Sequence, residues 1–285
     1  MNIYSRELEI VDFADNHTRQ ILMHQTQQAL IVLSVNSYSH WGRIITDIEQ
    51  SNLHFLKFRS VTVTDILIDE IAEELEDRHV MEILPSNSVS LVLLVRGEAV
   101  FSKMETLKQT VFKSFRSEII TSSNERNTSS LVELIFGSSR ISTATFDSCT
   151  CCIIKPHALK EKVCGAVLDM ITRSGFEISA VDLLHFDRSK AEEFLEVYKG
   201  VVPEYADQVT QLCSGPCLAL ELRGQEAVAM LRRLAGPWDV DIAKELYPES
   251  IRGSYGSDKV RCVVHCTDME EDIQLECHYC FRLMV

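Results

Sequence analysis

The feature that most restricts the fold of this 285-residue chain is an internal repeat. A strand-like apolar run, a polar loop, a helical stretch and a later strand that ends in Arg-Gly occur twice, in the same order and at an offset of roughly 121–127 residues. The repeated pieces are the apolar runs 29–33 and 151–154, the helical stretches 42–49 and 165–173, and the dipeptides Arg96-Gly97 and Arg223-Gly224. A duplicated domain explains this order. Because helices and strands alternate in each copy, we expect the α/β class, with helices packed on a sheet.

A change of composition near 137–148 marks the boundary between the two copies. Residues 137–143 are small and polar and lie between two apolar runs, as is typical of a linker. We therefore expect a first domain at 23–140 and a second domain at 149–285.

Three other segments carry structural signals. Residues 1–22 precede the first copy, and within them 8–13 alternate apolar and acidic side chains with the period of a half-buried strand. The polar stretch 121–130 predicts an exposed loop. The acidic run 65–77 predicts the solvated face of a helix, and a docking surface for a basic partner is the alternative.

Charge and composition exclude several functions. The net charge of −14 divides equally between the copies, so neither resembles a basic nucleic-acid-binding domain. No apolar run is long enough to span a membrane, and the first residues lack the pattern of a signal peptide. All ten cysteines lie at or after Cys149. In such a chain we expect reduced thiols and a cytoplasmic location, with no membrane and no nucleic-acid partner.

Two residues of the second copy suggest chemistry but are ambiguous alone. Lys155 ends a strand and precedes Pro156, which places an ammonium group in the loop above the sheet, where a phosphate can meet it. A solvated surface lysine is the alternative. His265 lies in a short apolar segment and by itself fits a buried core histidine equally well.

The order of the residues around these two resolves the ambiguity. The pattern consists of Lys155-Pro156, Tyr198, Ser214-Gly215-Pro216, Arg232, Ile251-Arg252-Gly253, His265-Cys266-Thr267-Asp268 and Glu276. Over about 151–282 it resembles the nucleoside diphosphate kinase family. The resemblance implies two tandem ferredoxin-like domains, each with a four-stranded antiparallel sheet and helices packed on it.

The resemblance also implies a ping-pong reaction, in which a histidine takes the γ-phosphate of a nucleoside triphosphate and passes it to a nucleoside diphosphate. Mg²⁺ bridges the nucleotide phosphates, and no dedicated metal site is expected. By position, His265 resembles the nucleophile, Glu276 the carboxylate that orients it, and Thr267 a supporting residue. Four more residues resemble the phosphate ligands: Lys155, Tyr198, Arg232 and Arg252. The residue types suit this chemistry because a neutral imidazole is nucleophilic near pH 7 and cations stabilise a transferring phosphoryl group.

The second copy departs from the family pattern around the nucleotide. Trp238 stands where the family has a phosphate-binding threonine, and Cys262 stands where it has an asparagine. Ala206 and Lys259 occupy the positions that hold the base. Loss of base stacking typically costs about 1–3 kcal/mol. We therefore expect weakened nucleotide binding.

The first copy departs further. Ser34 stands where a lysine is expected, and residues 112–136, which close the copy, contain no histidine. We expect this domain to be inactive.

The resemblance is to tandem members of the family found in the axoneme of cilia and flagella. It implies a cytoskeletal microtubule inner protein with tubulin and other inner proteins as partners, and some members are linked to centrosomal γ-tubulin complexes. Residues 1–22 resemble the last strand of a small β-domain that precedes the tandem. An active kinase that uses His265 and binds nucleoside di- and triphosphates is the alternative function.

The cysteines and histidines near the C-terminus also permit a zinc interpretation, because Cys277-x-x-Cys280 has the spacing of a zinc knuckle. Cys262, His265, Cys266 and His278 are the other candidates. We favour the absence of a metal site, because the intervening segment is acidic and helix-like.

Overall fold

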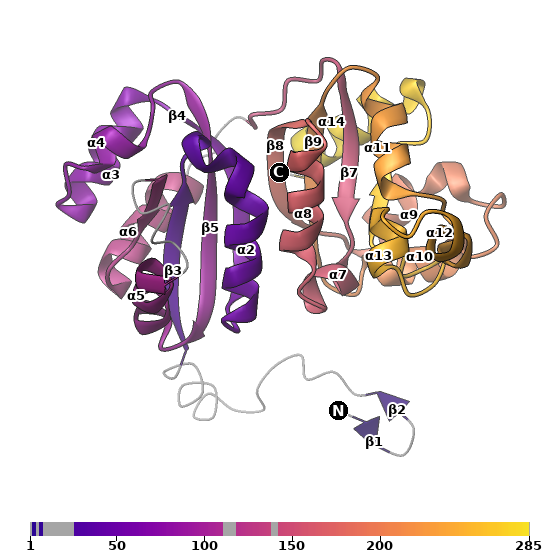
Figure 1. The fold of residues 1–285 in the computed structure, drawn as a ribbon, viewed down its shortest axis with the longest axis horizontal. Helices are drawn as coiled ribbons and strands as arrows, with labels where there is room; N and C mark the ends of the chain where they lie inside the picture. Colours follow the sequence, from indigo (N-terminus) through magenta and orange to yellow (C-terminus); the bar gives the residue numbers. More distant parts are fainter. Residues whose placement is uncertain (1, 4–5, 8–25, 111–117, 138–141, 285) are drawn as a thin grey trace.

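The computed structural model describes residues 2–3, 6–7, 26–110, 118–137 and 142–284. Two short antiparallel strands, β1 (Asn2–Ile3) and β2 (Arg6–Glu7), precede the main body (Figure 1). The strand expected at 8–13 lies outside the described residues. None of the helices in the described part is both long and apolar enough to cross a membrane.

The main body is built on one antiparallel sheet of eight strands, in the order β10-β7-β9-β8-β4-β5-β3-β6 (Figure 1). The first half supplies β3 (Thr26–Leu33), β4 (His54–Val63), β5 (Ser88–Glu98) and β6 (Ile119–Thr121). The second half supplies β7 (Cys149–Ile154), β8 (Glu177–His185), β9 (Pro216–Arg223) and β10 (Val264–Cys266). The expectation of α/β structure is confirmed, but the expectation of a separate four-stranded sheet in each domain is wrong. Strands β4 and β8 pair with each other, so each half covers an edge that the other would leave open.

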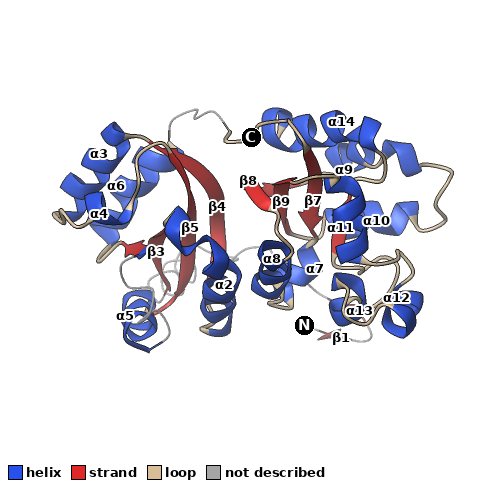
Figure 2. Ribbon diagram, turned by 45° about the horizontal axis from the view of Figure 1, so that its top comes forward, coloured by secondary structure: helices blue, strands red, loops and turns tan. Residues whose placement is uncertain are grey.

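Helices cover both faces of the sheet (Figure 2). Those of the first half are α2 (Trp41–Gln50), α3 (Asp65–Leu75), α4 (Val80–Ile83), α5 (Val100–Thr110) and α6 (Glu125–Phe136). Those of the second half are α7 (Pro156–Lys160), α8 (Cys164–Arg173), α9 (Arg188–Phe194), α10 (Tyr205–Leu212), α11 (Ala227–Ala235), α12 (Val240–Leu246), α13 (Ile251–Tyr255) and α14 (Ile273–His278). One face carries a single apolar core that includes residues of both halves, among them Ile44 and Val167. The other face carries a separate core for each half.

Helices α2 and α8 meet at the junction of the halves (Figures 1 and 2). Two glycines permit their close approach. A Cβ atom on Gly42 would lie 2.2 Å from the backbone nitrogen of Asp169, and one on Gly165 would lie 2.3 Å from that of Thr46. Neither position has room for a side chain, so the glycines allow the two helices to pack backbone against backbone.

Polar contacts also connect the two halves where strands β4 and β8 meet. The Arg59 guanidinium lies 2.9 Å from the Asp182 carboxylate, at the point where β4 and β8 pair. The Ser60 hydroxyl accepts a hydrogen bond from the backbone N–H of Val181 at 2.8 Å. The linker joins this network, because Thr143 Oγ1 lies 2.7 Å from Ser60 Oγ. The two halves are thus held together by backbone, side-chain and linker contacts.

The polar stretch 121–130 is not the exposed loop that its composition predicts. It contains the start of α6, because Asn124 caps the helix by accepting a hydrogen bond from the N–H of Asn127 at 2.9 Å. Thr128 and Leu131 are buried against the sheet. The apolar residues of this helix begin only after its first turn, which explains why composition misled the prediction.

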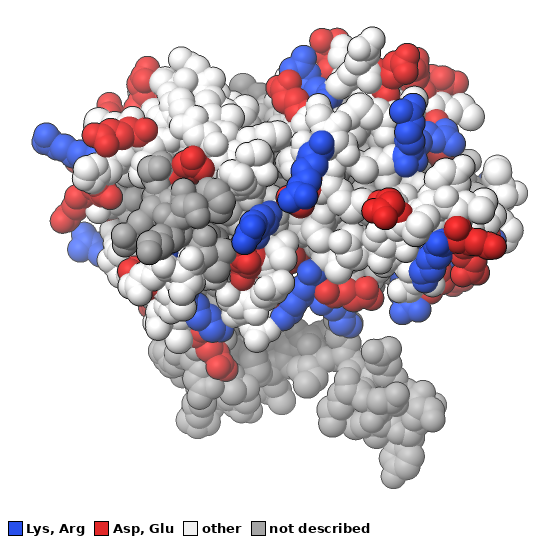
Figure 3. Space-filling view, viewed as in Figure 1, with Lys and Arg blue, Asp and Glu red and all other residues white. Residues whose placement is uncertain are grey.

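The acidic run 65–77 forms α3, whose acidic side chains are exposed or half-buried while Leu67, Ile68 and Ile71 enter the core. This agrees with a solvated helix face. On the face shown in Figure 3, Lys and Arg are interspersed with Asp and Glu and form no continuous basic surface among the described residues.

Glu49 of α2 is a buried charge at the junction. Its side chain is only 2% exposed and accepts a hydrogen bond from the N–H of Gly165 at 3.0 Å, while its Oε1 has no partner. Burial raises the pKa of Glu49 to about 7, against the smaller opposing effect of the N–H groups of Gly165 and Cys164. The folded state therefore holds a proton at Glu49 that the unfolded chain releases above the ordinary glutamate pKa of 4.5.

This predicts a specific pH dependence. As the pH rises from 4.5 to 7, the contribution of Glu49 should lower the free energy of unfolding, by up to about 3 kcal/mol above pH 7. Glu49→Gln should remove this loss, so that the variant gains stability over the unaltered chain between about pH 5 and 8. Urea unfolding at several pH values measures it. The exposed Glu105→Gln is the control, and a parallel loss of stability in both variants and the unaltered chain would contradict the assignment.

Candidate functional site: a buried histidine facing two buried cations

The candidate site lies at the end of β7 in the second half. Lys155 follows this strand in extended conformation and Pro156 begins α7, where a proline costs no hydrogen bond. Strand β10 lies beside β7 and places His265 opposite Ile153. The backbone thus brings the lysine and the histidine to one end of the sheet.

A strained residue fixes the entry to β10. Val263 has φ of 71°, a left-handed conformation that is costly for a β-branched side chain. Its carbonyl accepts from the N–H of Lys155 at 2.9 Å, and its N–H donates to Nε2 of His157 at 3.2 Å. Burial, and after it the charge of Lys155, lowers the pKa of His157 to about 4, so this ring remains a neutral acceptor.

His265, Glu276 and Thr267 form one hydrogen-bonded chain. Nε2 of His265 lies 3.0 Å from Oε1 of Glu276, and the Thr267 hydroxyl donates to Oε2 of Glu276 at 2.7 Å. The same hydroxyl accepts from the N–H of Cys151 at 3.0 Å. All three side chains are buried, so the carboxylate is held from both sides.

This chain sets the state of the imidazole. Burial alone would lower the pKa of His265, but the Glu276 carboxylate outweighs burial and raises it. Because Glu276 binds Nε2, the neutral ring carries its proton there and presents the lone pair of Nδ1, for which the described residues provide no hydrogen-bond partner. Such an orientation is what a histidine nucleophile requires.

Lys155 and Arg252 are buried cations without an anionic partner. Lys155 Nζ donates to Oε1 of Gln208 at 2.6 Å and contacts Cys262 Sγ at 3.2 Å. Arg252 donates to the carbonyls of Gly236 at 2.7 Å and Val264 at 3.1 Å. Within the described part of the chain, neither cation pairs with a carboxylate, and Nε of Arg252 has no acceptor. Two uncompensated positive charges in a poorly solvated region favour the binding of an anion.

Tyr198 and Arg232 meet on one carboxylate that sequence reasoning did not assign. The Tyr198 hydroxyl donates to Oδ2 of Asp268 at 2.7 Å. The Arg232 guanidinium lies 3.8 Å from Oδ1 of Asp268 and donates to its backbone carbonyl at 2.5 Å. Burial and the neighbouring Asp268 raise the pKa of Tyr198, so its hydroxyl remains a donor. The Asp268 carboxylate would compete with a phosphate for both groups.

The indole of Trp238 lies among these groups. Its ring centroid is 5.7 Å from Nζ of Lys155 and 5.9 Å from the guanidinium carbon of Arg252. The Tyr198 ring is 6.1 Å from the Trp238 ring and 6.1 Å from the His265 ring. Sequence comparison predicted only the loss of a hydroxyl at this position. In the structure, the indole also forms cation–π contacts with the two cations that a phosphate would need.

The two positions expected to hold a base do not form a clamp. Ala206 is exposed at the start of α10, and Lys259 forms an ion pair of 3.0 Å with Asp239. The corresponding place in the first half is closed by packing. There, Ser34 donates to the carbonyl of Ile83 at 2.8 Å and its own carbonyl accepts from the Trp41 indole at 3.2 Å.

All seven residues predicted from the sequence therefore lie in one connected region, and their roles there remain predictions. Reasoning from sequence missed Gln208 and Asp268. Gln208 has no signal in the sequence. Asp268 had one, since it follows His265 by three residues, beyond the end of a short strand.

Two of the zinc candidates suggested by spacing have other partners. His265 is bound to Glu276, and Cys262 contacts Lys155. All ten cysteines are free in the structure, and their reduced state remains a prediction.

Fold and site together define a duplicated α/β protein with a histidine oriented by a carboxylate, in the same region as two buried cations. Comparison with known proteins agrees with this class. The sequence pattern of the nucleoside diphosphate kinase family matches residues 148–284. Nucleoside diphosphate kinase homolog 7 of Rattus norvegicus is 34% identical over 312 residues, which cover 100% of this chain and 78% of the relative, and the Mus musculus protein matches equally.

The nucleoside diphosphate kinase of Aquifex aeolicus is 34% identical over 132 residues, which cover 46% of this chain and 92% of the relative. The chain belongs to the nucleoside diphosphate kinase family. Its similarity to homolog 7 extends over its whole length.

The electrostatics of His265 are testable without any turnover. Glu276→Gln removes the charge that raises the pKa of His265 and leaves burial as the dominant effect, so the pKa should fall below the ordinary histidine value of 6.5. NMR titration of the imidazole resonances measures the change. Glu271→Gln, which alters an exposed acid on the neighbouring turn, is the control and should leave the His265 titration in place. An unchanged pKa in Glu276→Gln would show that the carboxylate does not control the ring.

Proposed function

We propose that this protein is a structural component of the ciliary or flagellar axoneme, a microtubule inner protein built from two nucleoside diphosphate kinase folds with weak or lost kinase activity. The observation that carries the proposal is the Trp238 indole over Lys155 and Arg252. A nucleotide phosphate would have to displace an aromatic ring before reaching either cation.

The construction of the whole chain supports a structural role. The halves share one sheet and one of the apolar cores, so the two kinase folds are docked against each other. The first half has Ser34 in place of a lysine and uses that serine to anchor α4. The proposed partners are tubulin and other inner proteins of the doublet microtubule, and the proposed location includes the centrosome, where γ-tubulin complexes are the candidate partner.

Kinase activity in the second half is the second candidate function. It is favoured by the intact chain of His265, Glu276 and Thr267 and by the two buried cations. In such a reaction, Nδ1 of His265 would attack the γ-phosphorus, forming an N–P bond while the bond to the bridging oxygen breaks and the nucleoside diphosphate leaves. A second nucleoside diphosphate would then take the phosphoryl group and free the histidine.

The residues of this chain would divide the remaining work. Mg²⁺ would arrive with the nucleotide phosphates as part of the substrate. Lys155, Arg252 and Arg232 would stabilise the charge on the phosphoryl oxygens, and the Tyr198 hydroxyl would donate to them. Glu276 would stabilise the imidazolium that forms as Nδ1 bonds to phosphorus.

The obstruction by Trp238 can be tested directly. With γ-labelled ATP and Mg²⁺, Trp238→Thr should form acid-labile phosphohistidine at least about tenfold faster than the unaltered chain, which corresponds to about 1.4 kcal/mol of activation free energy. His265→Ala should abolish labelling. Tyr247→Thr, which replaces an exposed aromatic ring at the end of α12, is the matched control and should change nothing. Equal rates in Trp238→Thr and the unaltered chain would remove the main support for a degraded site and favour the kinase alternative.

The structural role requires its own experiment. Expressed with a tag in ciliated cells, the protein should remain with isolated doublet microtubules after detergent and moderate salt have removed the membrane and soluble matrix. His265→Ala should be retained equally, because the proposed role needs the fold and not the histidine. Release of the unaltered chain with the soluble matrix would contradict an inner-protein role.

A further inference from the structure

Four cysteines gather on the face of the second half that is covered by α9, α10 and α14. Cys149 and Cys151 are two residues apart on β7 and belong to the same apolar core. Cys277 of α14 and Cys280, in the turn that follows, belong to that core as well. All four are buried, with at most 3% exposure. None of them takes part in the site around His265.

A buried carboxylate joins the thiols. The Sγ atoms of Cys149 and Cys277 and a carboxylate oxygen of Glu221, from β9, all lie within 4.8 Å of one another. The Cys151 thiol interacts with the thiol of Cys277 and lies 4.0 Å from that of Cys280. Two sulfurs and one oxygen thus converge from two strands and a helix, and the thiol of Cys151 adjoins that of Cys277.

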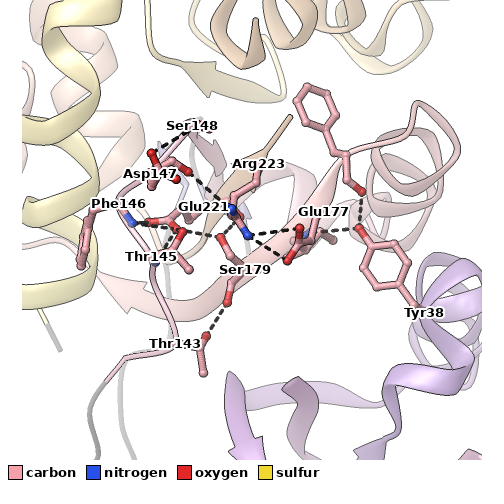
Figure 4. A network of polar contacts seen from close by, with 12 residues as sticks. Tyr38, Thr143, Thr145, Phe146, Asp147, Ser148, Glu177, Ser179, Glu221 and Arg223 are labelled. Carbon is pink, nitrogen blue, oxygen red and sulfur yellow. Dashed lines mark hydrogen bonds and ion pairs between the residues drawn. The ribbon is translucent and has the colours of Figure 1, made fainter. Parts of the chain in front are cut away.

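The Glu221 carboxylate is fully buried. Among the described residues, no cationic side chain forms an ion pair with it. Figure 4 shows the hydrogen bonds that it accepts. Oε1 accepts hydrogen bonds from the N–H and hydroxyl of Thr145, the hydroxyl of Ser179 and the N–H of Phe146. Oε2 accepts a hydrogen bond only from the N–H of Phe146, at 3.2 Å. One carboxylate oxygen therefore retains room for a further ligand.

We propose that Cys149, Cys277 and Glu221, with Cys151 as the fourth ligand, form a structural site for a thiophilic divalent cation, of which Zn²⁺ fits best. A tetrahedral zinc ion with sulfur ligands at about 2.3 Å needs sulfur atoms about 3.8 Å apart. The ligand atoms of Cys149, Cys277 and Glu221 lie within 4.8 Å of one another, so small side-chain rotations would close these three around an ion. The thiol of Cys151 adjoins this group through its interaction with the thiol of Cys277.

Charge and access agree with a metal. Binding releases one proton from each of the three thiols, and three thiolates, one carboxylate and Zn²⁺ sum to a net charge of −2, as in a four-cysteine zinc site. The metal supplies the positive charge that Glu221 lacks. A cavity of about 810 Å³ bounded by Phe146, Cys149 and Arg223 provides a route from solvent.

The site would tie the C-terminal helix to the sheet. Its ligands come from β7, β9 and α14, and α14 also carries Glu276, the partner of His265. The metal would therefore hold α14, the helix that orients the histidine, in place. The metal site and the site around His265 are separate clusters of residues.

The test uses the full chain, freed of metal with chelator under reducing conditions and titrated with Zn²⁺ and with Co²⁺. We expect one equivalent of Zn²⁺ to bind, and Co²⁺ to show sulfur-to-metal charge transfer and the visible bands of tetrahedral coordination. Cys149→Ser and Cys277→Ser should each weaken Zn²⁺ binding by more than about 100-fold, since loss even of outer partners costs about 10–100-fold. Cys217→Ser, a buried cysteine of the same core outside the cluster, should bind normally.

Glu221→Gln tests the role of the carboxylate and should weaken Zn²⁺ binding at least tenfold. Glu177→Gln, at an exposed position, is the control. Absence of stoichiometric binding, retention of binding in both cysteine variants, normal binding in Glu221→Gln, or a Cys149–Cys277 disulfide in place of the metal would each overturn the proposal.

Discussion

The pairing of β4 with β8 is the contact on which the rest of the structure depends. Each half ends at an edge strand with unpaired backbone groups, and the junction joins these edges into one sheet while α2 and α8 pack across it. Gly42 and Gly165 permit the helices to approach so closely that the backbone of each lines the other. The apolar core on that face then extends across both halves, so neither half presents an independent surface there.

In the second half, both faces of the sheet contribute to the candidate site. The core on the face of α2 and α8 also includes residues of α11 and α13, the helices that carry Arg232 and Arg252. In the second half, the candidate site lies at the end of β7, where Lys155, β10 and the loops before α12 and α13 meet, and α14 supplies Glu276 from the opposite face. The first half can stabilise the second half, because it covers β8 and α8. The duplication therefore serves the fold whether or not either half is catalytic.

Much of the fold and of the site could be predicted from the sequence, for identifiable reasons. The repeat and the apolar runs located the main strands, and the ordered pattern from Lys155 to Glu276 located the site residues. The continuity of the sheet could not be predicted, because it depends on one pair of strand edges, and no local pattern marks Arg59 and Asp182 as partners. Helix α6 was missed because its first turn is polar and only the cap at Asn124 marks its start.

The position of Trp238 shows why chemistry could be predicted better than geometry. A tryptophan in place of a threonine indicates that a hydroxyl has been lost, but the orientation of its indole ring cannot be predicted from the sequence. In the structure the indole faces two cations that have no carboxylate partner among the described residues. Such contacts are worth up to about 2 kcal/mol each when desolvated, comparable to the roughly 1.5–3 kcal/mol of a hydrogen bond to a charged group.

Trp238 therefore does two things at once. It forms cation–π contacts with Lys155 and Arg252, which stabilise both cations in the absence of an anion, and under the proposed function it also obstructs a phosphate. A site that must bind phosphate needs its cations unsatisfied until the substrate arrives, whereas a structural protein gains stability when they are satisfied. Under the proposed function, a ring that obstructs a phosphate also stabilises the folded chain, while His265, Glu276 and Thr267 remain buried and hydrogen-bonded to one another.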